Sequence, residues 1–571
     1  MPTLNWIGRE QIINHHKQVP YYVLNRQYSY DSEGQHSEDN GSQNMIIHGD
    51  NLFALKSLLP QYEGKIKCIY IDPPYNKGIS KTKWVYSDDV KDPIFITWLK
   101  SVVGDEGEDY SRHDKWLCMM YPRLKLLHRM LSDDGTILIS IDDSEQASLR
   151  SICDEIFGRS NFVCQFIWKT DGHTDNQDKI TGVHEYIICY AKNKEKQFIA
   201  NVVDPNTSQD SKILRSFAEN SITKNGYKNP PSVIELPIGF PCEAESLYIP
   251  VQDNILQFYE EAVSTNYITR ELTKKYDVTY PAKLDEMVVK NYRLTKPCRV
   301  FSGWMNNGKL NKFINNNCAP IADDGASLKF YLSKNGVIYY RKDGRTTHYI
   351  QSVLENMGTT ETNKYMLEEM GIKFDYPKPV TLIKFLISCF SEKNDIILDS
   401  FAGSGTTAHA VIAQNKVDGG KRRFVIIEML DYADSTTASR IKHIINRSGD
   451  SEEADTSFSY YELGETLLKD GLINEDISLE LIRQFVFYTE TKTAYKHNID
   501  MGYYLGSKDT TAYYFCYEKD RTVALNDAIL NNLKPGFDSY VIYADVCYIP
   551  DDFLKQHNIV FKKIPRDLGR F

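Results

Sequence analysis

Two short motifs in this chain carry residue types that could act together on one ligand. The first is Asp72-Pro73-Pro74-Tyr75, which directly follows the apolar segment KIKCIYI. An apolar run that stops at two prolines is typical of a buried strand, so we expect Asp72 at the carboxyl end of a strand, where open α/β sheets hold ligands. A carboxylate and a proline carbonyl can each accept one N–H of an exocyclic amine, while Tyr75 can stack on a base. The alternative is that the Asp-Pro pair only ends a strand.

The second motif is a glycine-rich turn at 399–406, DSFAGSGT, between an expected strand, DIILD, and an expected helix, AHAVIAQN. Gly403 and Gly405 permit a tight turn and a close approach of the backbone to a ligand, although tight packing explains the turn alone equally well. No lysine follows the glycines as in a phosphate loop, and the G-x-G-x-x-G fingerprint is incomplete. Glu428 ends the next strand, RRFVIIE, where an acid can accept hydrogen bonds from ribose hydroxyls. The turn therefore predicts a nucleoside cofactor without a large phosphate anchor.

The order of expected elements places both motifs in one sheet. Strand-like segments alternate with helical ones from Met45 to about residue 200, as in MIIHGD, NLFALKSLL, KIKCIYID and TILISI. This alternation fades, resumes near residue 360, and is typical of a parallel sheet covered by helices. The sequence predicts one α/β domain in two halves with an insertion between them. An acidic segment, SGDSEEAD, then precedes a tail rich in Tyr and Phe.

Charge is distributed unevenly along the chain. The 571 residues carry a net charge of −10, yet the window from Lys290 to Arg345 holds eleven Lys and Arg against three acids, or +8. A local basic surface on an acidic protein is a possible binding surface for a polyanion, although a solvated face explains a charge cluster alone just as simply.

Composition excludes several classes of protein. With 42% hydrophobic and 25% charged residues the chain is an ordinary globular protein, and no apolar run reaches the length of a membrane helix. The polar amino terminus lacks a signal peptide pattern, so we expect a cytoplasmic protein without membrane attachment. Eleven scattered cysteines without a CxxC pair indicate reduced thiols, and no metal site is expected.

Together, the two motifs resemble the beta class of S-adenosylmethionine-dependent DNA adenine-N6 methyltransferases, in which the catalytic motif precedes the cofactor motif. Within this class the chain is most similar to modification (Mod) subunits of type III restriction–modification systems. The similarity runs through GDNLFALKSLL, IYIDPPYNKG, YPRLKLLHRML, TILISIDD and HEYIICYAKN, and resumes at FDYPKPVTLIKFL, ILDSFAGSGTTAHAV and GGKRRFVIIE. It implies an α/β fold: a Rossmann-like, permuted methyltransferase domain with an inserted DNA target-recognition domain and a small α+β C-terminal domain.

The resemblance also implies domain boundaries. They are an N-terminal extension at 1–44, the catalytic half of the methyltransferase domain at 45–200, the target-recognition domain at 201–360, the cofactor-binding half at 361–450, and a C-terminal domain, with dimerisation as its expected role, at 451–571. The basic window falls inside the expected target-recognition domain.

Residue roles follow from the resemblance. Catalysis is assigned to the first motif. Asp72 and the Pro73 carbonyl would each accept a hydrogen bond from the adenine N6 amine, and Pro74 and Tyr75 complete the site. Cofactor binding is assigned to Asp50, Pro379, Thr381, Asp399, Phe401, Ala402, Gly403, Ser404, Gly405, Thr406 and Glu428. DNA binding is assigned to Arg293, Lys296, Arg299, Arg341, Lys342 and Arg345. The expected partners are double-stranded DNA, a second copy of the chain and a helicase–nuclease restriction subunit.

Three alternatives stay open at this point. The same geometry would suit cytosine-N4 methylation, although the initial Asp of the first motif favours adenine because the cytosine enzymes of this family more often begin it with Ser. A DNA-binding specificity subunit with an inactive centre is disfavoured by the intact motifs. A nicotinamide-dependent oxidoreductase is disfavoured by the incomplete fingerprint.

Overall fold

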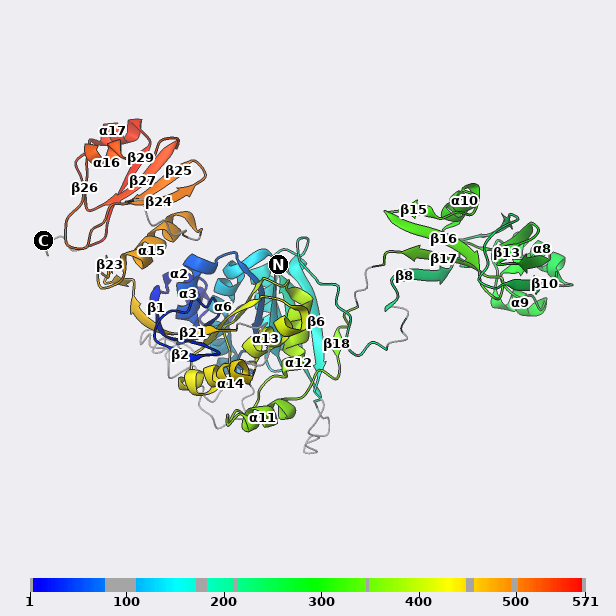
Figure 1. The fold of residues 1–571 in the computed structure, drawn as a ribbon, viewed down its shortest axis with the longest axis horizontal. Helices are drawn as coiled ribbons and strands as arrows, with labels where there is room; N and C mark the ends of the chain where they lie inside the picture. The colour runs from blue at the N-terminus through cyan, green and yellow to red at the C-terminus, as the bar shows by residue number, and fades with distance from the viewer. Residues whose placement is uncertain are drawn as a thin grey trace. The chain divides into compact units, whose positions relative to one another are not determined.

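A computed structural model of the chain describes residues 4–76, 109–170, 182–208, 211, 214–226, 228–345, 349–447, 456–493, 495 and 502–566. The chain forms two compact units, Met1–Ala200 with Gln351–Phe571, and Asn201–Ile350 (Figure 1). The acidic segment 448–455, expected to be a linker, lies outside the described residues.

An eleven-stranded sheet runs through the first unit. Its strands, in spatial order, are β18 (Val353–Leu354), β6 (Phe162–Lys169), β7 (His184–Ala191), β5 (Leu131–Ile141), β4 (Ile66–Ile71), β19 (Ile396–Asp399), β20 (Arg423–Glu428), β3 (Met45–His48), β21 (Phe458–Thr466), β1 (Tyr22–Asp31) and β2 (Gly34–His36). The six strands from β5 to β21 are parallel, whereas β7 is antiparallel to β5 and β1 is antiparallel to β21.

Helices cover both faces of this sheet. Ile69 of β4 and Leu398 of β19 share one core with α3 (Asn51–Tyr62), α6 (Asp109–Met130) and α7 (Gln146–Cys153). On the other face α12 (Val380–Phe390) packs on β4 and against α13 (Thr406–Asp418). This confirms the α/β, Rossmann-like expectation, with β4 preceding β19 along the chain.

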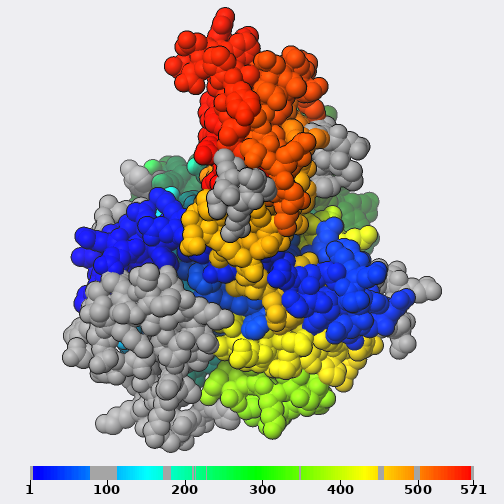
Figure 2. Space-filling view, turned by 90° about the vertical axis from the view of Figure 1, so that its left-hand side faces the viewer, coloured from blue at the N-terminus to red at the C-terminus, as the bar shows by residue number. Residues whose placement is uncertain are grey.

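The N-terminal residues and the segment after β20 complete the first unit. α1 (Arg9–Ile12) and α2 (His15–Gln18) pack on α6, while β1 packs beside α14 (Ser439–Arg447). The blue N-terminal residues and the yellow α14 lie side by side in Figure 2, and the Tyr30 hydroxyl donates to Asn446 Oδ1 at 2.9 Å. The expected N-terminal extension thus contributes two strands to the sheet, and β21, from the expected C-terminal domain, joins them.

The remaining C-terminal residues mix strands with helices. A four-stranded sheet has the order β24 (Tyr504–Lys508), β25 (Thr511–Phe515), β27 (Ser539–Ala544) and β29 (Ile559–Lys563). Its helices are α15 (Leu479–Thr491), α16 (Asp527–Asn531) and α17 (Asp551–Gln556), and two strand pairs are β22 (Leu468–Lys469) with β23 (Leu472–Ile473) and β26 (Ala524–Leu525) with β28 (Val546–Cys547). α15 contacts α3, and Tyr488 bonds to Glu63 and Arg129.

The second unit has a core of its own, formed by residues such as Leu236, Val300 and Phe330. Its described residues form three sheets. They are β10 (Ser246–Ile249), β12 (Met287–Lys290) and β13 (Arg293–Leu294); β11 (Ala282–Lys283), β14 (Cys298–Gly303) and β9 (Pro231–Leu236); and β15 (Ile321–Asp323), β16 (Ala326–Leu332), β17 (Ile338–Asp343) and β8 (Phe217–Ser221). Its helices are α8 (Ile255–Thr265), α9 (Arg270–Lys275) and α10 (Asn307–Asn315). The unit ends at Ile350, before the expected residue 360, because β18 pairs with β6 and α11 (Thr360–Glu369) follows in the first unit.

Candidate active site

Both sequence motifs lie at the same edge of the large sheet. β4 and β19 are adjacent parallel strands, with Ile69 paired to Leu398. Asp72 directly follows β4, and Asp399 is the last residue of β19. Because the two strands run in the same direction, the Asp72 motif and the glycine-rich turn leave the sheet side by side. Segments that are far apart in sequence therefore share one site.

Asp72 has one paired carboxylate oxygen and one without a partner. Lys378 Nζ lies 2.9 Å from Asp72 Oδ2 and 3.3 Å from Glu185 Oε2. Asp72 Oδ1 is buried and makes no hydrogen bond within the part of the chain that the structure describes. An acceptor left in this state is costly unless a ligand completes it. The carboxylate thus keeps one oxygen for an N–H donor.

Contacts from three directions fix the Pro-Pro-Tyr segment. Trp116 Nε1 donates to the Pro74 carbonyl at 2.7 Å, and the Tyr75 hydroxyl donates to Glu185 Oε2 at 2.9 Å. Lys378 Nζ lies 4.9 Å from the centre of the Tyr75 ring. Burial, followed by the charge of Asp72, raises the pKa of Tyr75 well above its usual value, so the hydroxyl stays neutral.

The glycine-rich turn is ordered by the carboxylate of its first residue, Asp399. Phe401 N–H donates to Asp399 Oδ1 at 2.9 Å, and the Thr407 hydroxyl donates to Oδ2. Burial raises the pKa of Asp399 to about 7. Gly405 has a φ of 79°, a left-handed conformation that only glycine adopts without strain, and α13 begins at the next residue. The hydrogen bonds to Asp399 therefore stabilise the conformation of the turn.

Glu428 lies at the end of β20, on the other side of β19. Its carboxylate accepts the Gly403 N–H at 2.7 Å and the Leu430 N–H at 3.0 Å. Burial raises its pKa to about 7. Its position at the carboxyl edge of the sheet, in contact with the glycine-rich turn, matches the position expected for a residue that holds a ribose.

Asp50 caps the helix that follows β3. Its Oδ1 accepts the Leu52 N–H at 2.7 Å and an Arg123 N–H at 3.0 Å. β3 is the neighbour of β20, and Gly49 N–H donates to the Glu428 carbonyl at 3.0 Å. Asp50 thus lies beside Glu428 at the same edge.

The two remaining predicted cofactor residues, Pro379 and Thr381, lie at the start of α12. Pro379 is the residue before the helix, and the Thr381 hydroxyl donates to the Met357 carbonyl. Thr381 is therefore already engaged within the fold. The adjacent Lys378 carbonyl accepts the Thr406 hydroxyl at 3.3 Å, which ties this segment to the glycine-rich turn.

Sequence reasoning missed three residues of this site. Lys378 lies in FDYPKPVTLIKFL and Glu185 lies in HEYIICYAKN, two of the segments quoted for their resemblance. The available signal was a charged residue within each of these segments. Arg440 is fully buried and donates to Ser404 Oγ at 2.9 Å and to Thr406 Oγ1 at 2.9 Å. A polar residue on the apolar face of a helix was its only signal.

The six predicted DNA-binding residues all lie in the second unit, and four of them pair with acids there. Arg299 binds Asp285 at 2.8 Å, and Lys296 binds Glu286 at 2.5 Å. Arg341 pairs with Asp343, and Lys342 pairs with Asp323 and Asp324. The sequence window omitted Asp285 and Glu286, and the whole unit carries only +3, from 19 basic and 16 acidic residues.

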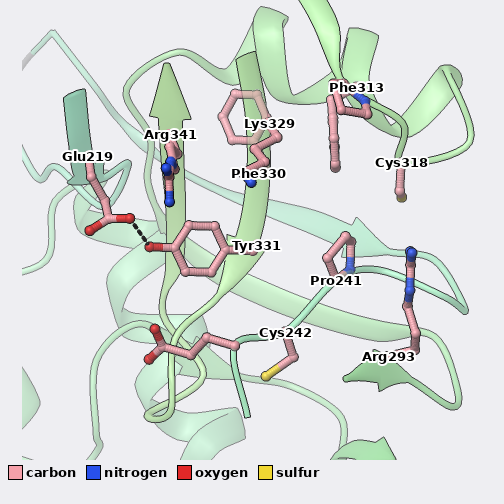
Figure 3. A pocket seen from close by; sticks show the side chains of 12 residues that line it. Glu219, Pro241, Cys242, Arg293, Phe313, Cys318, Lys329, Phe330, Tyr331 and Arg341 are labelled. Atoms are coloured by element: carbon pink, nitrogen blue, oxygen red, sulfur yellow. Dashed lines mark hydrogen bonds between the residues drawn. The ribbon is translucent and has the colours of Figure 1, made fainter. Parts of the chain in front are cut away.

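Arg293 and Arg341 line one hollow of about 470 Å³ in the second unit. Lys329 also lines it, together with Phe313 and Tyr331, as Figure 3 shows. The Tyr331 hydroxyl donates to Glu219 at 2.7 Å, and Arg293 donates to the Gly239 carbonyl at 2.8 Å. Arg345 lies at the end of the unit and is exposed. Two predicted DNA-binding residues therefore share a hollow, and their role stays a prediction.

The described residues contain no group of three or more His, Cys, Asp and Glu side chains arranged to hold a metal ion. Within the same residues, no helix combines the length and the apolar character needed to cross a membrane.

Comparison with known proteins identifies the family. A family described as DNA methylase matches residues 66–436, a span that includes both motifs and the second unit between them. The chain belongs to the DNA methylase family. Its relatives include the EcoPI Mod subunit of a type III restriction–modification enzyme from Escherichia phage P1, 31% identical over 440 residues, which cover 75% of this chain and 63% of that protein.

Two further relatives match most of the chain. The EcoP15I Mod subunit from Escherichia coli is 30% identical, over 78% of this chain and 67% of its own length. The type II methyltransferase M.KpnI from Klebsiella pneumoniae is 27% identical, over 71% of this chain and 85% of its own length. The chain thus spans about two thirds or less of the two type III relatives.

Proposed function

We propose that this DNA methylase transfers a methyl group from S-adenosylmethionine to the N6 amine of an adenine flipped out of double-stranded DNA. The observation that carries this proposal is the placement of Asp72 and the glycine-rich turn on adjacent parallel strands. Similarity to Mod subunits over three quarters of the chain supports it.

The residues at the sheet edge fit such a cofactor. Asp72 Oδ1 is a buried acceptor without a partner in the described chain, and Gly405 lets the turn pack closely on Thr437, from which a Cβ would lie only 3.2 Å away. The turn and Glu428 would hold the methionine part and the ribose, with Asp50 close to the adenine. When bound, the cofactor supplies an electrophilic methyl group on a sulfonium sulfur.

Asp72 and Pro73 would act on the target amine. An amine conjugated to a base ring is a weak nucleophile because its lone pair is delocalised into the ring. A carboxylate oxygen and a carbonyl, each accepting one N–H, localise that pair on nitrogen, and Tyr75 stacks on the base. The chain's contribution is therefore positioning and polarisation, without a covalent enzyme intermediate.

Adenine is favoured over cytosine because the motif begins with Asp. Cytosine-N4 methylation remains the second candidate, since its amine would meet the same two acceptors. An inactive specificity subunit is disfavoured because Asp72 keeps an acceptor without a partner among the residues that the structure describes. The hollow lined by Arg293 and Arg341 supports DNA binding by the second unit, since guanidinium groups suit phosphates and base edges.

The assembly is proposed from the relatives. Since two type III Mod subunits match, we propose that this chain serves as a modification subunit that pairs with itself and with a helicase–nuclease restriction subunit. The cytoplasmic location also stays an expectation from the sequence.

Single-molecule sequencing of DNA from cells that express only this chain tests the proposed function. We expect N6-methyladenine at one short recognition sequence, absent from cells with the empty vector. Modified cytosine at such a sequence would move the assignment to the second candidate. DNA without any modification would contradict methyl transfer by the chain alone.

A further inference from the structure

Lys378 is the link between the two motifs of the site. Its backbone carbonyl accepts the hydroxyl of Thr406, in the glycine-rich turn, and its ammonium contacts Asp72, in the other motif. Only 11% of its side chain is exposed. Pro379 follows it and fixes the local backbone. One residue therefore joins the cofactor turn to the acid that would accept the target amine.

The ammonium of Lys378 is fully engaged. It meets Asp72 Oδ2 at 2.9 Å and Glu185 Oε2 at 3.3 Å, and it lies 4.9 Å from the centre of the Tyr75 ring. These partners come from two elements, the end of β4 and the start of β7, while Lys378 itself lies in the segment before α12. Two carboxylates accept N–H donors of the ammonium, and the Tyr75 ring lies against it. These contacts restrict the position of the ammonium.

Two acids at this edge favour a cation between them. The carboxylates of Asp72 and Glu185 lie 2.9 Å and 3.3 Å from the ammonium, and without it their charges would repel one another in a medium of low dielectric constant. Burial lowers the pKa of Lys378, but the carboxylates of Asp72 and Glu185 outweigh burial and raise it, so the group stays charged.

The contacts of Lys378 divide the work of the Asp72 carboxylate between its two oxygens. Oδ2 is held by the ammonium, while Oδ1 is buried without a partner in the described residues. A carboxylate free to rotate could offer either oxygen to a donor. Because the ammonium fixes Oδ2, Oδ1 is the oxygen that remains to accept a donor, and its orientation is fixed as well.

We propose that Lys378 is a positioning residue for methyl transfer, which fixes Asp72 so that Oδ1 alone receives the target amine and which ties this acid to the cofactor turn. The inference rests on the proposed function and assigns a role to a residue outside both motifs. Lys378 acts through Asp72, Tyr75 and Thr406 and does not itself touch the reacting atoms.

The test compares Lys378→Met with wild type in single-turnover methylation at saturating cofactor and DNA, using the recognition sequence found by sequencing. Because misplacing a reacting group by about 1 Å costs on the order of 10²-fold in rate, we expect a loss of about that size. Binding of S-adenosylmethionine, measured by calorimetry, should change by less than about threefold. Lys364→Met is the matched control, because Lys364 is a half-exposed lysine on α11 that pairs only with Asp375 in the described residues, and it should behave as wild type.

A double-mutant cycle separates positioning from a general structural role. If Lys378 acts through Asp72, adding Lys378→Met to Asp72→Ala should cost almost nothing further. Lys378→Arg, which keeps the charge but moves it, should fall between wild type and Lys378→Met. Should Lys378→Met melt far below wild type, Lys378→Arg takes its place in the cycle, with the same expectation that its loss disappears in the Asp72→Ala background.

Clear outcomes would overturn the inference. A Lys378→Met rate within about threefold of wild type would show that Asp72 needs no anchor. A normal rate at saturation with greatly weakened cofactor binding would make Lys378 a cofactor ligand. Additive losses in the cycle would give it a role independent of Asp72. A wild-type protein that methylates no DNA would instead refute the proposed function.

Discussion

Three acids at the edge of the sheet differ in how their oxygens are used. Both oxygens of Asp399 and both oxygens of Glu428 accept hydrogen bonds from the chain itself. Asp72 alone among the three has an oxygen without a partner in the described residues. Asp399 therefore stabilises the glycine-rich turn, and Glu428 also binds this turn at the carboxyl edge of the sheet. Asp72 keeps one oxygen that can accept an N–H from the substrate.

Replacing Asp72 should separate catalysis from cofactor binding. In Asp72→Ala the target amine loses one of its two acceptors, and we expect the single-turnover rate to fall at least about 10²-fold to 10³-fold. The Kd of S-adenosylmethionine, measured by calorimetry, should stay within a few-fold of wild type. Asp375→Ala is the control, since Asp375 is largely exposed. Turnover that survives the Asp72 change nearly intact would make the assignment of this acid wrong.

The raised pKa of Glu428 predicts a pH dependence of cofactor affinity. Burial raises this pKa to about 7, so the carboxyl group is increasingly protonated below neutral pH and loses acceptor capacity for ribose hydroxyls. The affinity for S-adenosylmethionine should therefore rise with pH through about 7 and level off above about pH 8, by up to about tenfold per unit on the acid side.

Calorimetric titrations at several pH values measure this effect. Glu428→Gln should bind weakly, with a flatter pH profile, and the part that remains would come from Asp399, whose pKa burial also raises to about 7. If the affinity of Glu428→Gln changed with pH as steeply as that of wild type, Glu428 would not be the cause of the pH dependence.

At the scale of elements, the meeting of the two motifs could be predicted from the sequence. The segments before Asp72 and before Gly403 are apolar runs that end at ligand-binding residue types, and the resemblance supplied their order. Their adjacency is confirmed by the pairing of β4 with β19. Glu185 was missed for a physical reason: β7 is antiparallel to β5, so its amino end reaches the edge where the parallel strands end. Strand direction is a tertiary property that residue spacing does not encode.

The glycines at the two ends of α13 can be compared in a matched pair of variants. Gly405 and Gly419 flank this helix, with φ of 79° and 65°, so alanine at either position costs about 1–2 kcal/mol of backbone strain. A Cβ at Gly405 would also lie 3.2 Å from Thr437, whereas at Gly419 it meets open space. Gly405→Ala should therefore distort the turn and weaken cofactor binding about tenfold or more, while Gly419→Ala should lower the Tm without changing the Kd.

Calorimetry and thermal melts of both variants check this prediction. Equal cofactor affinities in the two variants would show that the turn tolerates the distortion or does not touch the cofactor.

At the scale of the whole molecule, the sequence predicted an insertion but not which residues close the large sheet. β1 lies in a polar N-terminal segment, and its partner β21 follows more than four hundred residues later. Pairing at that distance has no local signal. The basic window had the same limit, because the acids that neutralise Lys296 and Arg299 lie just outside it in sequence and beside it in the fold.

The second unit should be separable from the first. Val203 and Tyr349 form a β-bridge, so the chain enters and leaves this unit at neighbouring points, and a short Gly-Ser linker can replace residues 204–348. Since the first unit has its own core, the shortened protein should fold and bind S-adenosylmethionine with wild-type affinity. Sequence-specific DNA binding, measured by fluorescence anisotropy, should be lost. Site-specific methylation that persists without this unit would place target recognition elsewhere.

Product analysis tests the central claim most directly. Purified chain is incubated with plasmid DNA and S-adenosylmethionine carrying a deuterated methyl group, and the DNA is digested to nucleosides for mass spectrometry. We expect N6-methyldeoxyadenosine with the full deuterated methyl group from wild type, formed at least about 10²-fold more slowly by Asp72→Ala. N4-methyldeoxycytidine as the sole labelled product, or the same labelled yield from Asp72→Ala as from wild type, would contradict it.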